Sequence, residues 1–413
     1  MVFVALNYRA YDGFFQDDEI DNISFAPYIG GGEFATGFAT PLFLVNNFRP
    51  TGHLYFAVMG KLFGEDFPPY MTPIFALHLL NGCLIFALLR RIQVPVWHAL
   101  AAAAFFLLSA AAFDAYWKPM YVFDLLCTAF SLASILLYSH RRWVLSFIAF
   151  WLAYKSKEPA VMLPIALFAW EHWFGERKYL RLTPFLLVSL SFGVQGLLRN
   201  PNKANDYTFH FTWKALGATI PFYARRFLLF RGSGLLLVGL LFIRDRRVWF
   251  WLMAGACFIF PLLFLPGRLF EAYFYLPLAC AILGLAAAAS RVNPAWAWMA
   301  LLVWMPFNVH DLRKEQRVKL AADDEAYVFV ETLNHWVAHH RSIGTLVYNR
   351  PPGAYHHWGV SAAWHIAHHA LDLPAYSADS PEGKKAMAAQ VTAYGVWDEA
   401  AKRLDLRALA PGL

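Results

Sequence analysis

The sequence predicts an all-α polytopic membrane protein of ten or eleven transmembrane helices, followed by a small C-terminal α/β domain outside the membrane. Of its 413 residues, 59% are hydrophobic and only 15% are charged, whereas water-soluble domains carry about 25% charged residues. Apolar stretches that approach the roughly 20 residues needed to cross the hydrocarbon core recur between residues 70 and 307. The polar composition after residue 310 predicts two domains, residues 1–310 and 311–413.

Neither the cysteines nor the net charge points to a specific ligand or partner; both are typical of a membrane protein. All four cysteines lie in apolar stretches without metal-type spacing, which favours packing over disulfides or a zinc site. The net charge of +7 comes largely from lysines and arginines in short loops, and this positive-inside pattern marks cytoplasmic loops. We therefore interpret the charge as membrane orientation and expect membrane lipids, but no nucleic acid, among the partners.

The basic clusters predict the topology, because assigning all of them to the cytoplasm gives a consistent alternation of helices. The predicted spans are residues 70–89, 97–115, 120–139, 143–155, 158–175, 182–198, 233–243, 248–265, 270–290 and 294–309. Some are shorter than a full crossing, which favours tilted or broken helices around a wet cavity. Residues 1–6 are too short to span, so we expect a truncated or short first helix.

A first external loop, residues 9–69, contains the stretch FFQDDEIDN with four acids in nine residues. Neighbouring carboxylates repel one another, so one can stay ionised while another serves as a base. Asp17, Asp18 and Glu19 are therefore catalytic candidates. A solvated acidic loop is the alternative interpretation.

Two further acids and a lysine lie near the external ends of predicted helices. Asp114 ends one span, and Asp124 lies about one turn into the next, with Lys118 between them. Ionisable groups at such depth are costly and usually face a cavity or a partner. A purely structural Asp to Lys pair would satisfy the same pattern.

Cations recur on the same predicted face. Lys155, Lys157 and Glu158 stand between two apolar half-spans, where lysines can also merely snorkel to the interface. Arg268 precedes the next helix among aromatic residues, and it could pair with Glu271 or with a phosphate. An arginine fork matches phosphate oxygens bidentately, so a lipid phosphate is a plausible ligand.

The tail begins with a charged stretch, residues 311–340, that predicts a helix, and GTLVYNRPPGAYHHWG predicts a strand ended by a turn. Its histidines are dense, and His365 and His369 would share one helical face. Without acidic or cysteine partners at matching spacing, a role in stability or acceptor recognition is favoured over a metal site.

Taken together, these segments resemble the GT-C glycosyltransferases that use a polyprenyl-phosphate sugar, and within them the protein O-mannosyltransferase branch that includes the tetratricopeptide-containing transmembrane enzymes. The resemblance covers roughly residues 10–290. It rests on five segments in the family's order: FFQDDEIDN; NFRPTGHLYFAVMGKLFG with YMTPIFALHLLNGCLIFALLRR; SAAAFDAYWKPMYVFDLLCTAFSLASILLY; YKSKEPAVMLPIALFAWE; and GRLFEAYFYLP. The chain departs from the family at Val122 and Phe123, where an arginine is usual, and no tetratricopeptide repeats follow.

The resemblance implies inverting transfer of a sugar, such as mannose, from a polyprenyl-phosphate donor to an acceptor hydroxyl on a protein, glycan or lipid. Asp18 would be the general base, with Asp17 the alternative, because Asp18 and Glu19 resemble the family's Asp-Glu pair. Lys157, Lys118 and Arg268 would bind the donor phosphate. Asp114 and Asp124 would orient the acceptor or sugar, or Asp114 would hold a divalent cation, Mg²⁺ or Mn²⁺, with the first-loop acids.

Two other classes of function fit parts of the pattern. A transporter or lipid flippase would also use broken helices and buried charges, but it predicts repeated halves and a charged site near the bilayer midplane. A silent scaffold would leave the first-loop acids replaceable. The expected location is the bacterial inner membrane, with the active site and the C-terminal domain in the periplasm; an endoplasmic reticulum location, with lumen in place of periplasm, would satisfy the same topology.

Overall fold

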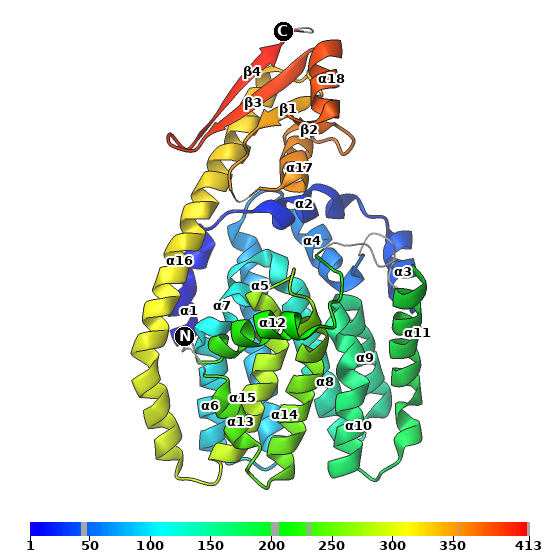
Figure 1. Ribbon diagram of the computed structural model, residues 1–413, viewed down its shortest axis with the longest axis vertical. Helices are drawn as coiled ribbons and strands as arrows, with labels where there is room; N and C mark the ends of the chain where they lie inside the picture. The colour runs from blue at the N-terminus through cyan, green and yellow to red at the C-terminus, as the bar shows by residue number, and fades with distance from the viewer. Residues whose placement is uncertain (43–47, 200–205, 229–232, 354, 411–413) are drawn as a thin grey trace. The chain divides into compact units, whose positions relative to one another are not determined.

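The computed structural model describes residues 1–42, 48–199, 206–228, 233–353 and 355–410, and it confirms the predicted fold class. The chain is mostly helical, with a four-stranded sheet near its C-terminus (Figure 1). It divides into two compact units. We call Met1–Val4, Gly31–Gly52 and Thr72–Leu312 the transmembrane unit, and Ala5–Gly30, His53–Met71 and Arg313–Leu413 the C-terminal unit. The predicted boundary at residue 310 stays a prediction.

Four helical segments of the described chain are long and apolar enough to cross a membrane, and a bent pair makes a fifth. They are Pro68–Arg91, Pro119–Ser139, Arg246–Phe264 and Glu271–Ala289, with the pair Val96–Leu108 and Ala110–Trp117 bent by 53°. The bend lies at Ser109, whose side chain accepts a hydrogen bond from the amide of Ala111. Each segment matches a span predicted from the sequence.

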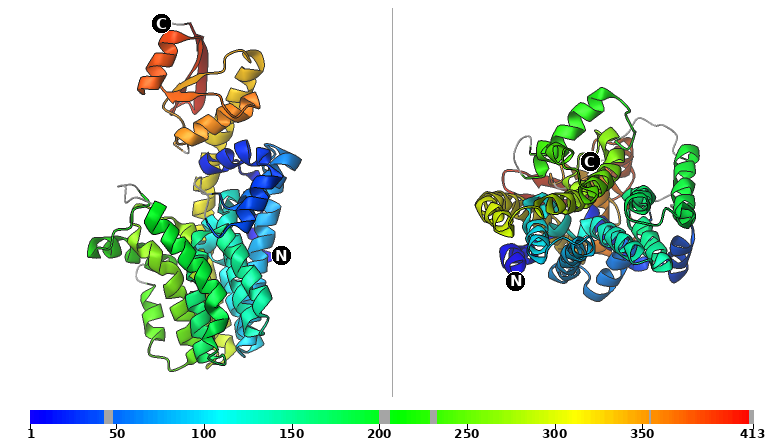
Figure 2. Two further views of the ribbon diagram at one scale, coloured as in Figure 1. Left: turned by 90° about the vertical axis from the view of Figure 1, so that its right-hand side faces the viewer. Right: turned by 90° about the horizontal axis from the view of Figure 1, so that it is seen from below.

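The helices of the transmembrane unit run side by side as a bundle (Figures 1 and 2). Its elements are α3 (Gly31–Ala39), α5 (Pro68–Arg91), α6 (Val96–Leu108), α7 (Phe113–Trp117), α8 (Val122–Ser139), α9 (Trp143–Ser156), α10 (Leu163–Trp173), α11 (Thr183–Arg199), α12 (Trp213–Arg226), α13 (Leu235–Leu240), α14 (Arg246–Ile259) and α15 (Tyr275–Ala289). Short 3₁₀ turns interrupt them, among them η4 (Pro119–Tyr121), η5 (Glu158–Met162) and η8 (Glu271–Phe274). The break between α9 and η5, beside the short predicted span 143–155, is one of the broken helices expected from the sequence.

The last predicted span was drawn too short. The sequence predicts a span over residues 294–309 and then a separate charged helix, whereas the structure has one helix, α16, over Pro294–His339. The charged stretch has no helix breaker, and its apolar residues Leu320, Phe329 and Leu333 are buried. The helix therefore continues into the C-terminal unit, where this apolar face has a core to cover.

The C-terminal unit combines N-terminal helices with the sheet. Its helices are α1 (Val2–Asn7), α2 (Asp17–Phe25), α4 (Pro50–Phe63), α17 (His357–His368) and α18 (Pro381–Ala389), with α1 and α4 each beginning in the transmembrane unit. The strands are β1 (Leu346–Asn349), β2 (Ala375–Ser377), β3 (Thr392–Asp398) and β4 (Arg403–Leu409), in the order β2-β1-β3-β4. β1 pairs parallel with β2 and β3, and β4 pairs antiparallel with β3.

The predicted strand of the tail is confirmed as β1, and the turn after it leads into α17. The expected pairing of His365 with His369 on one helical face is wrong. His369 lies past the end of α17 with φ of 53°, in the left-handed region. His365 instead contacts the carbonyl of Leu373 through Nε2 at 2.9 Å.

Candidate functional site

Two ion pairs join distant segments inside the transmembrane unit. Nζ of Lys157, at the end of α9, lies 2.6 Å from Oδ2 of Asp124 in the first turn of α8, with side chains only 10% and 7% exposed. Arg49 donates from Nε and Nη2 to Oε1 of Glu158, at 3.0 and 2.6 Å. Buried charges such as Asp124 and Lys157 are stable only when they are paired, whereas Arg49 and Glu158 are partly exposed, at 18% and 33% of their side chains. The pairs therefore fix where the segments around residues 49, 124 and 157 meet.

Hydroxyl and aromatic groups extend this cluster. Thr51 donates to the carbonyl of Lys155 at 3.0 Å and lies 2.8 Å from the hydroxyl of Ser156. The ammonium of Lys157 lies 4.4 Å from the centre of the Tyr273 ring. Arg49 lies 5.6 Å from the ring of Phe123, which stands where the resembled family has its arginine. Four of the five resembled segments thus contribute to one cluster.

A buried polar group ties the helix with His78 and Asn81 to the segment AYFYLP. The Tyr275 hydroxyl lies 2.7 Å from Nδ1 of His78 and accepts from Asn81 Nδ2 at 3.2 Å. His78 Nε2 faces the carbonyl of Leu107 at 3.1 Å. A carbonyl can only accept, so Nε2 carries the proton and Nδ1 accepts from the tyrosine. His78, Asn81 and Tyr275 lie in segments that carry the family resemblance, but the sequence alone gave them no predicted role.

Of the remaining predicted residues of the transmembrane unit, Asp114 and Lys118 lie at helix ends and Arg268 lies in the loop between η7 (Phe260–Phe264) and η8. Asp114 is in the first turn of α7, and Lys118 is buried at its C-cap. The guanidinium of Arg268 lies 4.3 Å from the ring centre of Tyr207 and 4.6 Å from that of Phe270. The suggested pair between Arg268 and Glu271 does not form, because Glu271 pairs with Arg226.

The first-loop acids lie in the C-terminal unit, where they form the first turns of helix α2. Glu19 closes a capping box by accepting from the amide of Gln16 at 2.8 Å, and its side chain is buried. Asp17 accepts from the backbone amide and Nδ1 of His356 at 2.8 and 2.6 Å, at the start of α17. Asp18 accepts from the indole nitrogen of Trp358 at 2.8 Å. The three acids therefore differ in their surroundings.

Asp21 is a fourth acid that sequence reasoning did not assign to the site. It lies one turn after Asp17 and Asp18, on the same face of α2. Burial, together with the negative charges of Asp18 and Asp17, raises the pKa of Asp21 to about 7. Burial also raises the pKa of Asp17, against the opposing hydrogen bonds from His356. The signal available in the sequence was the spacing of Asp17, Asp18 and Asp21, because residues three or four apart lie on the same face of a helix.

The predicted site residues are divided between the two units. Asp17, Asp18 and Glu19 belong to the C-terminal unit, and the other five belong to the transmembrane unit: Asp114, Lys118, Asp124, Lys157 and Arg268. Their convergence on one external cavity stays a prediction. Among the described residues, no group of three or more histidine, cysteine or acidic side chains is placed to hold a metal. Whether a divalent cation takes part stays a prediction, because one or two carboxylates together with a substrate phosphate can hold Mg²⁺.

No protein-family model and no curated protein matches the sequence. Among solved structures, the fold is similar to the crystal structure of ArnT from Cupriavidus metallidurans bound to undecaprenyl phosphate. The likeness covers 89% of this chain and 77% of that chain, at 16% sequence identity and a TM-score of 0.40. A TM-score below 0.5 is too low to assign a fold or an activity.

The buried pair of Asp124 and Lys157 predicts a strongly coupled response to mutation. Asp124→Asn or Lys157→Met leaves one buried charge without its partner and should cost about 3–5 kcal/mol of stability. The double variant should recover part of that loss. Thermal unfolding of the purified variants in detergent measures the coupling, and additive losses in the double variant would contradict it.

The raised pKa of Asp21 predicts a pH-dependent stability. The native carboxyl keeps its proton between the ordinary value of 3.8 and about 7, a range in which the unfolded chain has lost it. Stability therefore falls as pH rises through this window. Asp21→Asn should remove this loss of stability, so the variant should be more stable than the wild type at pH 8 but not at pH 4.

Unfolding midpoints at several pH values test this, with Asp12→Asn as the control for a surface acid whose side chain is 61% exposed. Identical pH profiles for wild type and Asp21→Asn would contradict the assignment.

Gly359 of α17 predicts a steric requirement at the acids. A Cβ at this position would lie 2.2 Å from Oδ1 of Asp17, whereas one at Gly353 would meet nothing within 4 Å. Gly359→Ala should therefore destabilise the packing of α17 on α2 by about 1–3 kcal/mol, although alanine is the better helix former. Gly353→Ala is the matched control. Limited proteolysis and unfolding midpoints measure the difference, and equal behaviour of the two variants would refute the close contact.

Proposed function

We propose that this chain is an integral membrane glycosyltransferase of GT-C type that moves a sugar from a polyprenyl-phosphate donor to an acceptor hydroxyl with inversion. One observation carries the proposal. Four of the five segments that resemble this family, far apart in the sequence, meet through their charged and polar residues, in the contacts of Arg49 with Glu158, Lys157 with Asp124, and Tyr275 with His78 and Asn81. A chance likeness of short segments would not require such contacts.

In the proposed reaction the acceptor oxygen attacks C1 of the sugar, and the bond from C1 to the phosphate oxygen breaks. The acceptor proton passes to a carboxylate, and the lipid phosphate leaves with the bonding electrons. Asp18 is the preferred base, because Asp17 caps α17 and Glu19 caps α2. A positioned base contributes about 10²–10⁴ in rate.

The departing lipid phosphate gains negative charge, so cations directed at it stabilise the transition state. Lys157, Lys118 and Arg268 are the proposed ligands. In the structure Lys157 is paired with Asp124, which positions its ammonium. Asp124 would thus act by holding Lys157, and Asp114 would orient the acceptor or the sugar. A requirement for Mg²⁺ or Mn²⁺ stays a prediction, which assays with a chelator would test.

The proposal also includes the side of the membrane on which transfer occurs, the sugar and the acceptor. The basic clusters at residues 90–91, 140–142 and 244–247 support an external, periplasmic site by the positive-inside rule. Mannose is the sugar suggested by the resemblance, and the acceptor is a hydroxyl of a protein, glycan or lipid.

The assay is transfer from radiolabelled polyprenyl-phosphate sugars in membranes that contain wild type, Asp18→Asn, Asp17→Asn or the control Asp12→Asn. Asp18→Asn should lose about 10²–10⁴ of the rate, while Asp12→Asn should keep it. Undiminished transfer by both Asp18→Asn and Asp17→Asn would overturn the assignment of the base. Absence of transfer from every polyprenyl-phosphate sugar by the folded wild-type protein would overturn the proposed function.

A further inference from the structure

The transmembrane unit contains a polar cavity of about 430 Å³ that the proposed reaction does not use. It lies where α8 and α10 end and where α9 and α14 begin, and the last residue of α5 also lines it. Tyr138 at this cavity and Asp124 of the ion-pair cluster are fourteen residues apart in the single helix α8, which corresponds to about 20 Å along the axis. The cavity is therefore a separate site.

The lining is rich in positive charge. Five arginines line the cavity, namely Arg91, Arg141, Arg181, Arg246 and Arg247. Three carboxylates face them: Glu171, Glu176 and Asp245. Two positive charges are thus left without a matching carboxylate in the lining. A concave surface with excess positive charge attracts anions.

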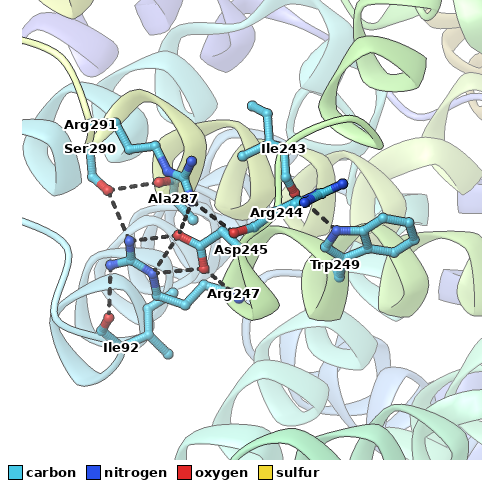
Figure 3. Close-up of polar contacts among 9 residues, drawn as sticks. All are labelled: Ile92, Ile243, Arg244, Asp245, Arg247, Trp249, Ala287, Ser290 and Arg291. Carbon is cyan, nitrogen blue, oxygen red and sulfur yellow. Dashed lines mark hydrogen bonds and ion pairs between the residues drawn. The ribbon is translucent and has the colours of Figure 1, made fainter.

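The carboxylates are already engaged. Asp245 accepts from Arg247 at 2.8 Å and lies 3.3 Å from Arg291 (Figure 3). Burial alone would raise the pKa of Asp245, but hydrogen bonds from Arg247 outweigh it and lower the pKa to about 2. Glu176 is shared by Arg141, Lys178 and Arg181.

Glu171 holds a turn, and among the described residues it forms no ion pair with an arginine. It accepts from the Tyr138 hydroxyl at 3.1 Å and from the amides of Glu176 and Lys178 at 3.1 and 2.7 Å. The cations of the cavity therefore compete for two carboxylates, Glu176 and Asp245. A bound ligand with one or two negative charges would give these cations a further partner.

The arginines also present donors that the helix ends do not use. Arg91 gives Nη2 to the carbonyl of Ser139 at 2.6 Å, and Arg246 gives Nη1 to that of Trp173 at 3.1 Å. The Arg181 guanidinium stacks 4.5 Å from the ring centre of Trp143, which fixes its plane. Among the described residues its Nη1 is buried with no hydrogen-bond partner. Each guanidinium has five N–H donors. The contacts with carbonyls at helix ends use only some of these donors.

From this geometry we infer that the cavity binds the phosphate group of an anion at the end of the bundle that carries the basic clusters. Arginine forks match phosphate oxygens, and basic pockets between transmembrane helices bind anionic lipid headgroups. The phosphate comes from an anionic lipid headgroup or from a soluble phosphate, and both present the same oxygens. The inference does not depend on the proposed transferase activity.

The test uses the full chain purified in detergent and two probes. Native mass spectrometry with cardiolipin, against phosphatidylcholine as the neutral reference, measures the lipid source. Thermal unfolding in inorganic phosphate, against chloride at equal ionic strength, measures the soluble source. Preference for cardiolipin supports the lipid headgroup, and stabilisation by phosphate without a lipid preference supports the soluble anion.

Variants separate the cavity from general surface charge. Arg181→Gln and Arg141→Gln should each weaken binding about tenfold, the loss expected for one charge-assisted contact. The side chain of Arg141 is 72% exposed, so its replacement leaves packing intact even if Arg181→Gln fails to fold. The adjacent Arg142→Gln, outside the cavity lining, is the matched control. Equal weakening by Arg141→Gln and Arg142→Gln, or no preference for either anionic probe, would overturn the inference.

Discussion

The pairing of buried charges is the constraint on which the transmembrane unit depends. Burying the Lys157 ammonium and the Asp124 carboxylate costs several kcal/mol per ion unless each meets a partner, and the partly buried Arg49 and Glu158 face a smaller form of the same cost. Lys157 with Asp124, and Arg49 with Glu158, satisfy this condition. Because Lys157 and Glu158 are consecutive residues, the two pairs link the start of α8, the segment before α4 and the break between α9 and η5.

Several ionisable groups of this unit lie at breaks in the helices. Lys157 lies between α9 and η5, Glu158 begins η5, Lys118 caps the end of α7, and Glu271 begins η8. A helix break frees backbone donors and acceptors, which lipid cannot satisfy, so it is tolerated where protein or a wet cavity surrounds it. The same interruption that exposes backbone polar groups thus lets a charged side chain reach a partner.

In the C-terminal unit, structural and chemical demands divide four neighbouring acids. Asp17 and Glu19 accept hydrogen bonds from backbone amides at the starts of α17 and α2, where the positive ends of helices favour anions. Asp18 accepts a hydrogen bond from the indole nitrogen of Trp358, and the pKa of Asp21 is raised to about 7. Burial raises the pKa of both Asp17 and Asp21, while Asp17 and Glu19 are also engaged at helix starts, so these neighbouring acids serve different structural roles.

The sequence by itself determined the membrane character, most helix positions and the segments that bear charge, because hydrophobic length and breaks at polar residues act locally. It also predicted the strand β1 and the helix start at Glu158. Only the tertiary structure decided that Asp124 pairs with Lys157, that Glu271 pairs with Arg226 and not with Arg268, and that α16 continues to His339. Partner choice among several nearby charges depends on three-dimensional distance and shared burial, and neither is visible in residue spacing. The acidity of Asp21 was hidden for the same reason, since it arises from the burial of α2 and from neighbours that only the folded helix brings onto one face.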